Sequence, residues 1–272
     1  MFGKLGLGLG LGAHRRVDYG NMPATFTVTS GDGTKYVRVQ VSETTTVTPA
    51  GGTSIRIGNT GEFVTTPLTL AANTYQDIYF NGAGSFTIPK RNLVTYLVLS
   101  ILGSSIITGK ITGMKLTHLT LYDIGSSVIT GDITGMSLER LYLDSIGSSI
   151  ITGDINGMAL TRLYLHNVGL SLTYGTNQLN ITDNLGVQLR GDTAFATAAE
   201  YARLIHDAAN ATWSGAYPFT ITAGTNDNCP DWDTVKADVA VLLTKAAWTI
   251  IPSAWLSANG GSWPTNWKEY TG

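Results

Sequence analysis

The sequence predicts a mainly β protein built around a solenoid, and three observations support this prediction. Residues 102–167 contain three consecutive units of 22 residues, and the second and third units are identical at 16 of their 22 positions. A fixed repeat of this length is typical of a solenoid. Charged residues make up only 13% of the chain, which also contains 32 glycines. Short runs of alternating apolar and polar residues flank the repeats, as expected of strands.

Each repeat unit contains two recurring apolar segments. One is L-x-x-L-x-L-x-x-I, seen in Leu116, Leu119, Leu121 and Ile124, and the other is I-T-G-x-I, which ends at Ile133. A single unit cannot bury these residues, whereas stacked units form continuous aliphatic ladders with strands about 4.8 Å apart. We therefore expect all of these side chains to lie in the core.

These segments resemble leucine-rich repeats over residues 92–167. L-x-x-L-x-L is similar to the strand segment of that family, and I-T-G-D-I resembles the L-T-G-x-I-P segment of one repeat class. The resemblance implies a leucine-rich-repeat-like solenoid with a parallel sheet on its concave side. The family's internal Asn ladder is replaced here by Ile124, Ile146 and Val168, so we expect an aliphatic ladder at this position.

The N-terminal third is expected to contain two segments. Residues 1–19 form an extended anchor, and its alternating Leu-Gly run favours a strand with four leucines on one side. These leucines are Leu5, Leu7, Leu9 and Leu11. A cleaved signal peptide is the alternative interpretation of this run. Residues 20–90 form a β-sandwich-like module, because alternating runs recur about every ten residues with turn signals between them.

The solenoid is expected to span residues 91–252, with regular units at 102–167 and helix-containing units at 185–252. One helix begins at a capping box formed by Thr197 and Glu200, and a second follows Pro230. The α/β C-terminal part is thus interpreted as the same solenoid with helices on its back, the alternative being a separate small α/β domain. Residues 253–272 form a C-terminal cap or tail with three tryptophans, either covering the apolar end or binding a sugar or partner.

The sequence predicts no catalytic residue, no metal site and no cofactor. The net charge of -2 gives no electrostatic reason to expect nucleic acid, and no apolar run is long enough to span a membrane. No phosphate-binding, zinc-protease or serine-hydrolase motif occurs. Asp227, Asp231 and Asp233 suggest either a calcium site or, more simply, a loop that caps a helix.

The residues between the strand leucines are the best candidates for a binding surface. They point outward, and stacking arranges them in columns that vary although the rest of the unit hardly changes. Tyr and Arg are enriched at binding hot spots, so we expect a recognition face for a protein or glycan. The alternative is that the tyrosines only shield the sheet. The face comprises Tyr96, His118, Tyr122, Arg140, Tyr142, Asp144, Arg162, Tyr164 and His166.

These observations predict a non-enzymatic structural and recognition protein. The arrangement of anchor, β module and solenoid resembles small bacteriophage virion proteins such as fibres, spikes or appendages. That resemblance implies a location in the virion, other virion proteins as partners of the N-terminus, and a host-surface protein or glycan as ligand; a homo-oligomer is compatible with it. The alternatives are a secreted or cell-surface leucine-rich-repeat adhesin and a glycan-cleaving tailspike. In a tailspike, Asp132 and Asp154 would stack one coil apart, about 4.8 Å from each other.

Overall fold

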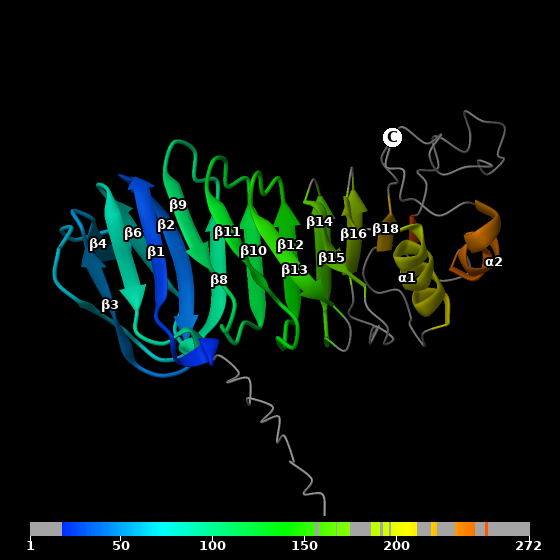
Figure 1. Ribbon diagram of the computed structural model, residues 1–272, viewed down its shortest axis with the longest axis horizontal. Coiled ribbons are helices and arrows are strands. Elements are labelled where there is room, and N and C mark those ends of the chain that lie inside the picture. Colours follow the sequence, from blue (N-terminus) through cyan, green and yellow to red (C-terminus); the bar gives the residue numbers. More distant parts are fainter. Residues whose placement is uncertain are drawn as a thin grey trace, which may run out of the picture.

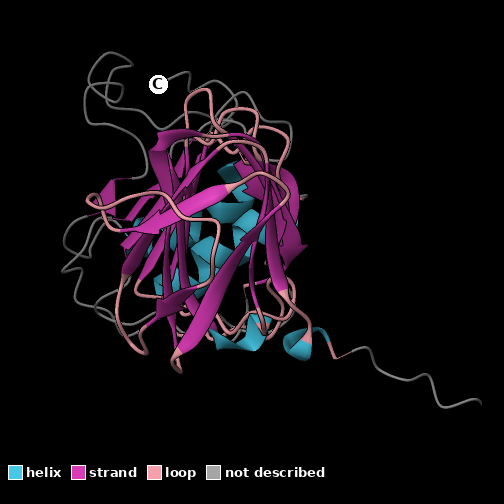
Figure 2. Ribbon diagram, turned by 90° about the vertical axis from the view of Figure 1, so that its left-hand side faces the viewer, coloured by secondary structure: helices cyan, strands magenta, loops and turns pink. Residues whose placement is uncertain are grey.

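The computed structural model is a mainly β protein with an elongated β-solenoid of about three turns (Figure 1). The structure describes residues 18–155, 158–166, 168–174, 186–190, 193–195, 197–210, 219–221, 232–242 and 248–249. Two sheets face each other, and loops join them at both margins (Figure 2). The side chains between the sheets form one continuous hydrophobic core.

The first sheet has nine strands within the described residues, in the order β17-β15-β13-β11-β9-β1-β7-β3-β5. Their bounds, in chain order, are β1 Ala24–Ser30, β3 Thr45–Ala50, β5 Leu68–Leu70, β7 Gly84–Ile88, β9 Ile106–Lys110, β11 Val128–Asp132, β13 Ile150–Asp154, β15 Gly169–Thr173 and β17 Thr193–Phe195.

The second sheet has ten strands in the same ranges, in the order β19-β18-β16-β14-β12-β10-β8-β2-β6-β4. Their bounds are β2 Asp32–Val41, β4 Ser54–Ile57, β6 Gln76–Asn81, β8 Val94–Ser100, β10 His118–Tyr122, β12 Arg140–Asp144, β14 Arg162–His166, β16 Gly186–Arg190, β18 Phe219–Ile221 and β19 Trp248–Thr249. Two 3₁₀ turns, η1 Tyr19–Asn21 and η2 Arg91–Leu93, lie side by side near the start of the solenoid.

The repeat unit forms one coil of the solenoid, with one strand in each sheet. In the second sheet, strands β8, β10, β12 and β14 are parallel and pair with an offset of one whole unit, so that His118 lies between Tyr96 and Arg140. The leucines and isoleucines expected in the core are fully buried, including Leu119, Leu121 and Ile124. The expected aliphatic ladder continues through Ile146 and Val168, which are 1% and 5% exposed. Both predictions are therefore confirmed.

The first sheet has a different register. Asp132 on β11 pairs with Thr152 on β13, so neighbours are two residues short of a full unit. Equivalent residues are consequently displaced by about 6.6 Å along the strand for each step of about 4.8 Å between strands. For this reason the strands of the first sheet slant relative to those of the second (Figure 1). Only the second sheet places equivalent residues directly beside one another.

The glycine of I-T-G-x-I is required by close packing between coils. Gly153 has a φ of 114°, and a Cβ atom built on it would lie 2.7 Å from the backbone nitrogen of Thr134. At Gly131 the same atom would lie 2.5 Å from the Ile111 side chain. Real Cβ atoms do not approach other atoms this closely, and L-residues avoid such φ values. The glycine therefore lets successive coils of the first sheet approach each other.

A ladder of buried serines, which we did not predict, stabilises the turn that leads into the first sheet. The Ser127 hydroxyl accepts a hydrogen bond of 3.0 Å from the backbone N–H of Ile107, and Ser149 accepts one of 2.8 Å from Ile129. Each hydroxyl also lies 3.4–3.5 Å from the carbonyl oxygen of the serine one coil earlier. Ser105 begins the ladder, and its buried hydroxyl has no hydrogen-bond partner within the described residues.

The N-terminal strands join the same two sheets. The alternating runs expected between residues 20 and 90 form strands β1 to β6, and β7 follows them as a strand that was not expected. β1 pairs antiparallel with β9, and β2 pairs antiparallel with β8. The first coil is thus covered by antiparallel strands that extend both sheets. The interpretation of residues 20–90 as a sandwich-like module of their own stays a prediction.

Beyond β15, the described strands of the second sheet continue in parallel, with β16 paired to β18 and β18 to β19. Helix α1 Ala198–Asn210 lies between β17 and β18, and α2 Trp232–Leu242 between β18 and β19. The expected capping box is present, because Thr197 and Glu200 exchange backbone-to-side-chain hydrogen bonds of 3.1 and 3.3 Å. The α/β character of the whole C-terminal part stays a prediction. The residues of the expected cap, 253–272, lie outside the described ranges.

We expect Ser127→Ala to lower the free energy of unfolding by about 1–3 kcal/mol, because the buried N–H of Ile107 would lose its acceptor. Urea titration followed by circular dichroism measures this loss. Ser105→Ala is the matched control, since its buried hydroxyl accepts no backbone N–H from a preceding coil. The control should be close to neutral or stabilising. Equal losses in the two variants would contradict a stabilising role for the ladder.

Candidate functional site

The outer face of the second sheet carries the predicted recognition residues in three parallel rows. Strands β8, β10, β12 and β14 each contribute one residue to every row because they pair in register. We call the first row, Tyr96, His118, Arg140 and Arg162, the ring–arginine row. The second, Val98, Thr120, Tyr142 and Tyr164, is the tyrosine row. The third is Ser100, Tyr122, Asp144 and His166.

The ring–arginine row has rings at one end and guanidinium groups at the other. The Tyr96 ring centroid lies 5.2 Å from that of His118. On the other side, Tyr75 packs edge-on against Tyr96 at 4.7 Å and is 58% exposed. Arg140 and Arg162 are direct neighbours on adjacent strands, and both are exposed. Tyr75 therefore extends this row by one ring beyond the predicted residues.

The tyrosine row contains a stacked pair. The rings of Tyr142 and Tyr164 are nearly parallel, at 4°, with centroids 4.2 Å apart. Tyr122 meets Tyr142 edge-on at 6.0 Å. Burial raises the pKa of Tyr142, and the charge and hydrogen bond of Tyr164 raise it further. Tyr142 is therefore a neutral phenol at physiological pH, able to donate a hydrogen bond.

Asp144 has a structural place in the third row. It is 6% exposed, and its carboxylate accepts a hydrogen bond of 2.8 Å from the Ser145 hydroxyl. His166 Nδ1 lies 2.9 Å from the same carboxylate oxygen. A carboxylate held in this way is turned toward its neighbours, so Asp144 is not available to contact a ligand. His166 and Tyr122 remain accessible beside it.

His118 is the titratable group at the centre of the ring–arginine row. Its Nδ1 atom lies 3.0 Å from the Thr117 hydroxyl, which donates its own proton to the Thr95 carbonyl at 3.1 Å. The Thr117 oxygen therefore acts as acceptor, which assigns the proton to Nδ1 of His118. Burial lowers the pKa of His118, and the nearby positive charge of Arg140 lowers it further.

The sequence reasoning missed the continuation of this face into the N-terminal strands. Arg38 pairs opposite Val98 and forms an ion pair of 2.6 Å with Asp77. Tyr36 packs on Tyr79 at 5.1 Å, and the Arg56 guanidinium lies 4.9 Å from the Tyr79 ring centroid. The alternation of β2 was visible in the sequence, but the antiparallel pairing of β2 with β8 was not.

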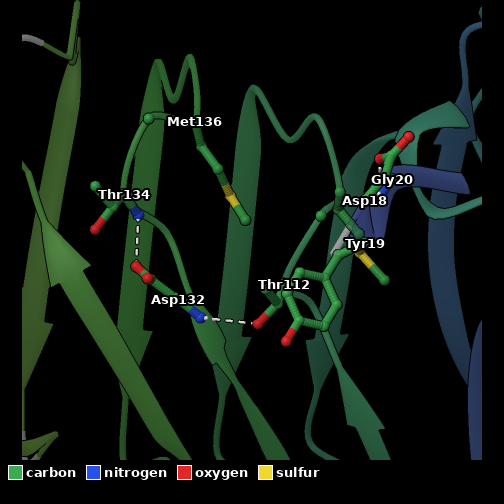
Figure 3. Close-up of a pocket in the computed structure, with 10 residues that line it drawn as sticks. Asp18, Tyr19, Gly20, Thr112, Asp132, Thr134 and Met136 are labelled. Carbon is green, nitrogen blue, oxygen red and sulfur yellow. Dashed lines mark hydrogen bonds between the residues drawn. The ribbon is translucent and has the colours of Figure 1, made fainter. Parts of the chain in front are cut away.

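A shallow groove of about 630 Å³ lies at the edge of the first sheet, along the T-G-M turns at residues 112–114 and 134–136 (Figure 3). Tyr19 of η1 occupies the turn of the first coil, where Gly113 leaves no room for a Cβ atom. On the next coil, Thr134 and Met136 line the groove together with Asp132. The Asp132 carboxylate is already engaged, because it accepts a hydrogen bond of 2.8 Å from the Thr134 backbone.

The carboxylate pair considered for a glycan-cleaving enzyme is not formed as expected. Asp132 pairs with Thr152, and the backbone N–H of Asp154 donates to the Thr134 hydroxyl at 3.2 Å. The expected stacking of Asp132 on Asp154 at about 4.8 Å is therefore wrong, because the first sheet is offset by two residues per coil. Within the described residues, no three His, Cys, Asp or Glu side chains lie close enough together to hold a metal ion.

Several expected features lie outside the described residues. These are the anchor leucines Leu5, Leu7, Leu9 and Leu11, the three C-terminal tryptophans, and Asp227 and Asp231. Asp233 is described, and it forms an ion pair of 2.7 Å with Lys236. In the described parts of the chain, no helix is both long and apolar enough to cross a membrane.

Comparison with known proteins gives no match to this chain, whether with family models, curated proteins or solved structures.

We expect the protein to lose stability on acidification through His118. Its pKa is lowered in the folded state, so the unfolded chain, with a pKa near 6.5, takes up the proton first as the pH falls. The free energy of unfolding should therefore decrease from pH 7.5 to pH 5. The free energy of unfolding of the His118→Gln variant should decrease less over this range. Urea titration at both pH values measures the difference. An equal decrease in both proteins would show that other groups cause the loss.

Proposed function

We propose that the protein is a non-enzymatic structural and recognition protein that binds its ligand on the outer face of the second sheet. The observation that supports this proposal best is the register of this sheet. It places Tyr, His and Arg side chains in straight rows on a rigid parallel scaffold. Sites held on regular strands are more precisely oriented than sites on loops. Exposed aromatic and arginine side chains are also the typical hot spots of binding surfaces.

The proposed setting is a bacteriophage virion, in which the protein forms a fibre, spike or appendage. The N-terminus would attach it to other virion proteins, and the leucine-rich-repeat-like solenoid would present the face to the host. Support comes from the elongated shape of the part of the chain that the structure describes (Figure 1). The alternative proposal is a secreted or cell-surface adhesin, which would use the same face.

The non-enzymatic part of the proposal rests on the chemistry of the face. Its one acidic row residue, Asp144, is buried against His166 and Ser145. The other functional groups in the rows are guanidinium groups, two imidazoles, phenols and hydroxyls. A glycosidase needs two carboxyl groups at a set separation on either side of the scissile bond. On the opposite sheet, the observed register removes the direct stacking of Asp132 on Asp154 that a retaining glycosidase would need.

The recognition face can be tested with the double variant Arg140→Gln, Tyr142→Phe. It should keep the wild-type urea midpoint, because Arg140 is exposed and the Tyr142 ring stack is retained. Attachment of the fluorescently labelled protein to a panel of bacterial cells should fall about tenfold or more, since hot-spot residues contribute about 2 kcal/mol or more.

The control for this test is Thr130→Ala, Thr152→Ala, which changes the outer face of the first sheet. It should attach as well as the wild type. Equal attachment by both double variants, or attachment to no bacterial surface, would contradict the proposal.

The two settings predict different N-termini. A virion component should be recovered from purified particles with residues 1–19 intact, because the anchor must persist. An adhesin should be recovered from the cell surface or medium with a mature start near Ala13, after removal of a signal peptide. Mass spectrometry of the N-terminal peptide in both fractions distinguishes them. A start near Ala13 would rule out the virion setting and leave the recognition face in place.

A further inference from the structure

Two T-G-M turns at the margin of the first sheet have the same geometry. The turns at residues 111–114 and 133–136 each close with a hydrogen bond of 3.0 Å from the methionine N–H to the isoleucine carbonyl. Their glycines, Gly113 and Gly135, have φ values of 87° and 74°. A glycine with positive φ at the third position is typical of a type II turn. A segment that covers one of these turns would therefore also fit the other.

Tyr19 shows what covers the turn of the first coil. A Cβ atom built on Gly113 would lie 2.7 Å from the carbonyl carbon and the Cβ atom of Tyr19, so the main chain of η1 lies directly on this turn. The Tyr19 ring reaches Lys110, whose Nζ atom lies 5.2 Å from the ring centroid. A cation at this distance is attracted to an aromatic ring. The cover thus combines a main-chain segment with a side chain that suits the charge of the residue before the turn.

The turn of the next coil has no such cover within the described residues. A Cβ atom built on Gly135 would meet no atom within 4 Å. Thr134 and Gly135 are exposed, whereas their equivalents on the first coil are half-buried. The groove of about 630 Å³ lies between η1 and this open turn, and Tyr19 forms its wall (Figure 3). The space that a covering segment would fill is already formed.

The residue before the turn changes from a cation to an anion. Asp132 stands one unit after Lys110 and is exposed. Its carboxylate accepts the hydrogen bond from Thr134, and it forms no ion pair with any part of the chain that the structure describes. A carboxylate attracts a cationic side chain and repels the electron-rich face of an aromatic ring. The second turn therefore favours a different side chain from the tyrosine that covers the first.

The surroundings of Asp132 suit the stem of a long cationic side chain. A second groove, of about 470 Å³, adjoins the first and shares Tyr19, Thr112 and Asp132 with it. Ile150 also lines this groove and is 54% exposed. Arginine and lysine pack their apolar stems on such surfaces while the charged end reaches a polar partner. Lys110, the cation that also lines this groove, lies over the Tyr19 ring.

We propose that this open turn is a docking site for a basic segment of a partner protein. The segment lies with its main chain on Gly135 and its arginine or lysine at Asp132, in the place that Tyr19 occupies one coil earlier. The site is on the margin of the first sheet and is separate from the recognition face on the second sheet. The inference therefore goes beyond the proposed function and does not depend on it.

The test uses isotope-labelled full-length protein and two peptides with capped ends. One peptide has the sequence of residues 17–22, V-D-Y-G-N-M, and the other has arginine in place of the tyrosine. The arginine peptide should shift the amide resonances of Thr134, Gly135 and Met136. It should bind about fivefold more tightly than the tyrosine peptide, as expected for one exposed ion pair. Shifts at Gly113 instead, or no shifts, would overturn the inference.

The variant Asp132→Lys tests the origin of this preference. It places on the second coil the cation that Lys110 supplies on the first, so the tyrosine peptide should now bind more tightly than the arginine peptide. Equal binding of the two peptides by the wild-type protein, or an unchanged preference in this variant, would contradict the proposed contact with Asp132.

The variant Gly135→Asn tests the position of the main chain. Asparagine tolerates the left-handed backbone, and its side chain would fill the space over the turn, so binding of both peptides should fall at least about tenfold. Gly58→Asn is the matched control, because Gly58 has a φ of 81° and equally open surroundings. The control should bind like the wild type, and both variants should keep the circular dichroism spectrum of the folded protein. Unchanged binding by Gly135→Asn would place the peptide elsewhere and overturn the inference.

Discussion

In-register parallel pairing of the second sheet is the constraint on which the rest of the structure depends. Each coil must return to the same position after 22 residues, as shown by His118 between Tyr96 and Arg140. This return stacks Leu119 and Leu121 on their equivalents and buries them completely. Parallel strands have no short connection, so the path must cross to the other sheet and come back. The turns, the glycines and the serine ladder all allow or stabilise this return from one sheet to the other.

The first coil shows how the solenoid is closed at its N-terminal end. An open stack would expose a row of unpaired backbone groups on both sheets, which promotes unwanted association. β1 and β2 cover these two edges in antiparallel orientation. An antiparallel neighbour does not repeat the geometry of the coil, so the internal ladders must stop there. Ser105 marks this boundary, because its hydroxyl accepts no backbone N–H of a preceding coil, whereas Ser127 and Ser149 accept those of Ile107 and Ile129.

Much of the scaffold could be predicted from the sequence because burial imposes a period. Leu116 and Ile133 were assigned to the core from the repeat alone, and the capping box at Thr197 from local chemistry. The two-residue offset between neighbouring strands of the first sheet could not be predicted. The repeat shows which residues are equivalent in successive units, but it does not show how far one strand is shifted along the next. Serines in a G-S-S turn look like ordinary turn residues, so the ladder was missed. The backbone of Ile101, which has a left-handed φ of 47°, could not be predicted either, because isoleucine rarely adopts this conformation.

The candidate face was only partly predictable. The outward direction of Tyr142 and Arg140 follows from strand alternation. The burial of Asp144 depends on His166 one strand away and on the neighbouring Ser145, a combination that no single strand reveals. The contribution of Tyr75 depends on a loop between β5 and β6 reaching over Tyr96. The burial of Asp144 and the position of Tyr75 both depend on contacts between segments that are distant in the sequence.

The difference in register between the two sheets has a consequence for how such a protein can change in evolution. Duplicating one 22-residue unit lengthens every row of the second sheet by one strand, about 4.8 Å, without altering the spacing of the existing side chains. On the first sheet the same duplication shifts each new residue two positions along its strand. Gene duplication can thus add side chains to one surface at a constant spacing, while on the opposite surface each added unit shifts equivalent residues along their strands.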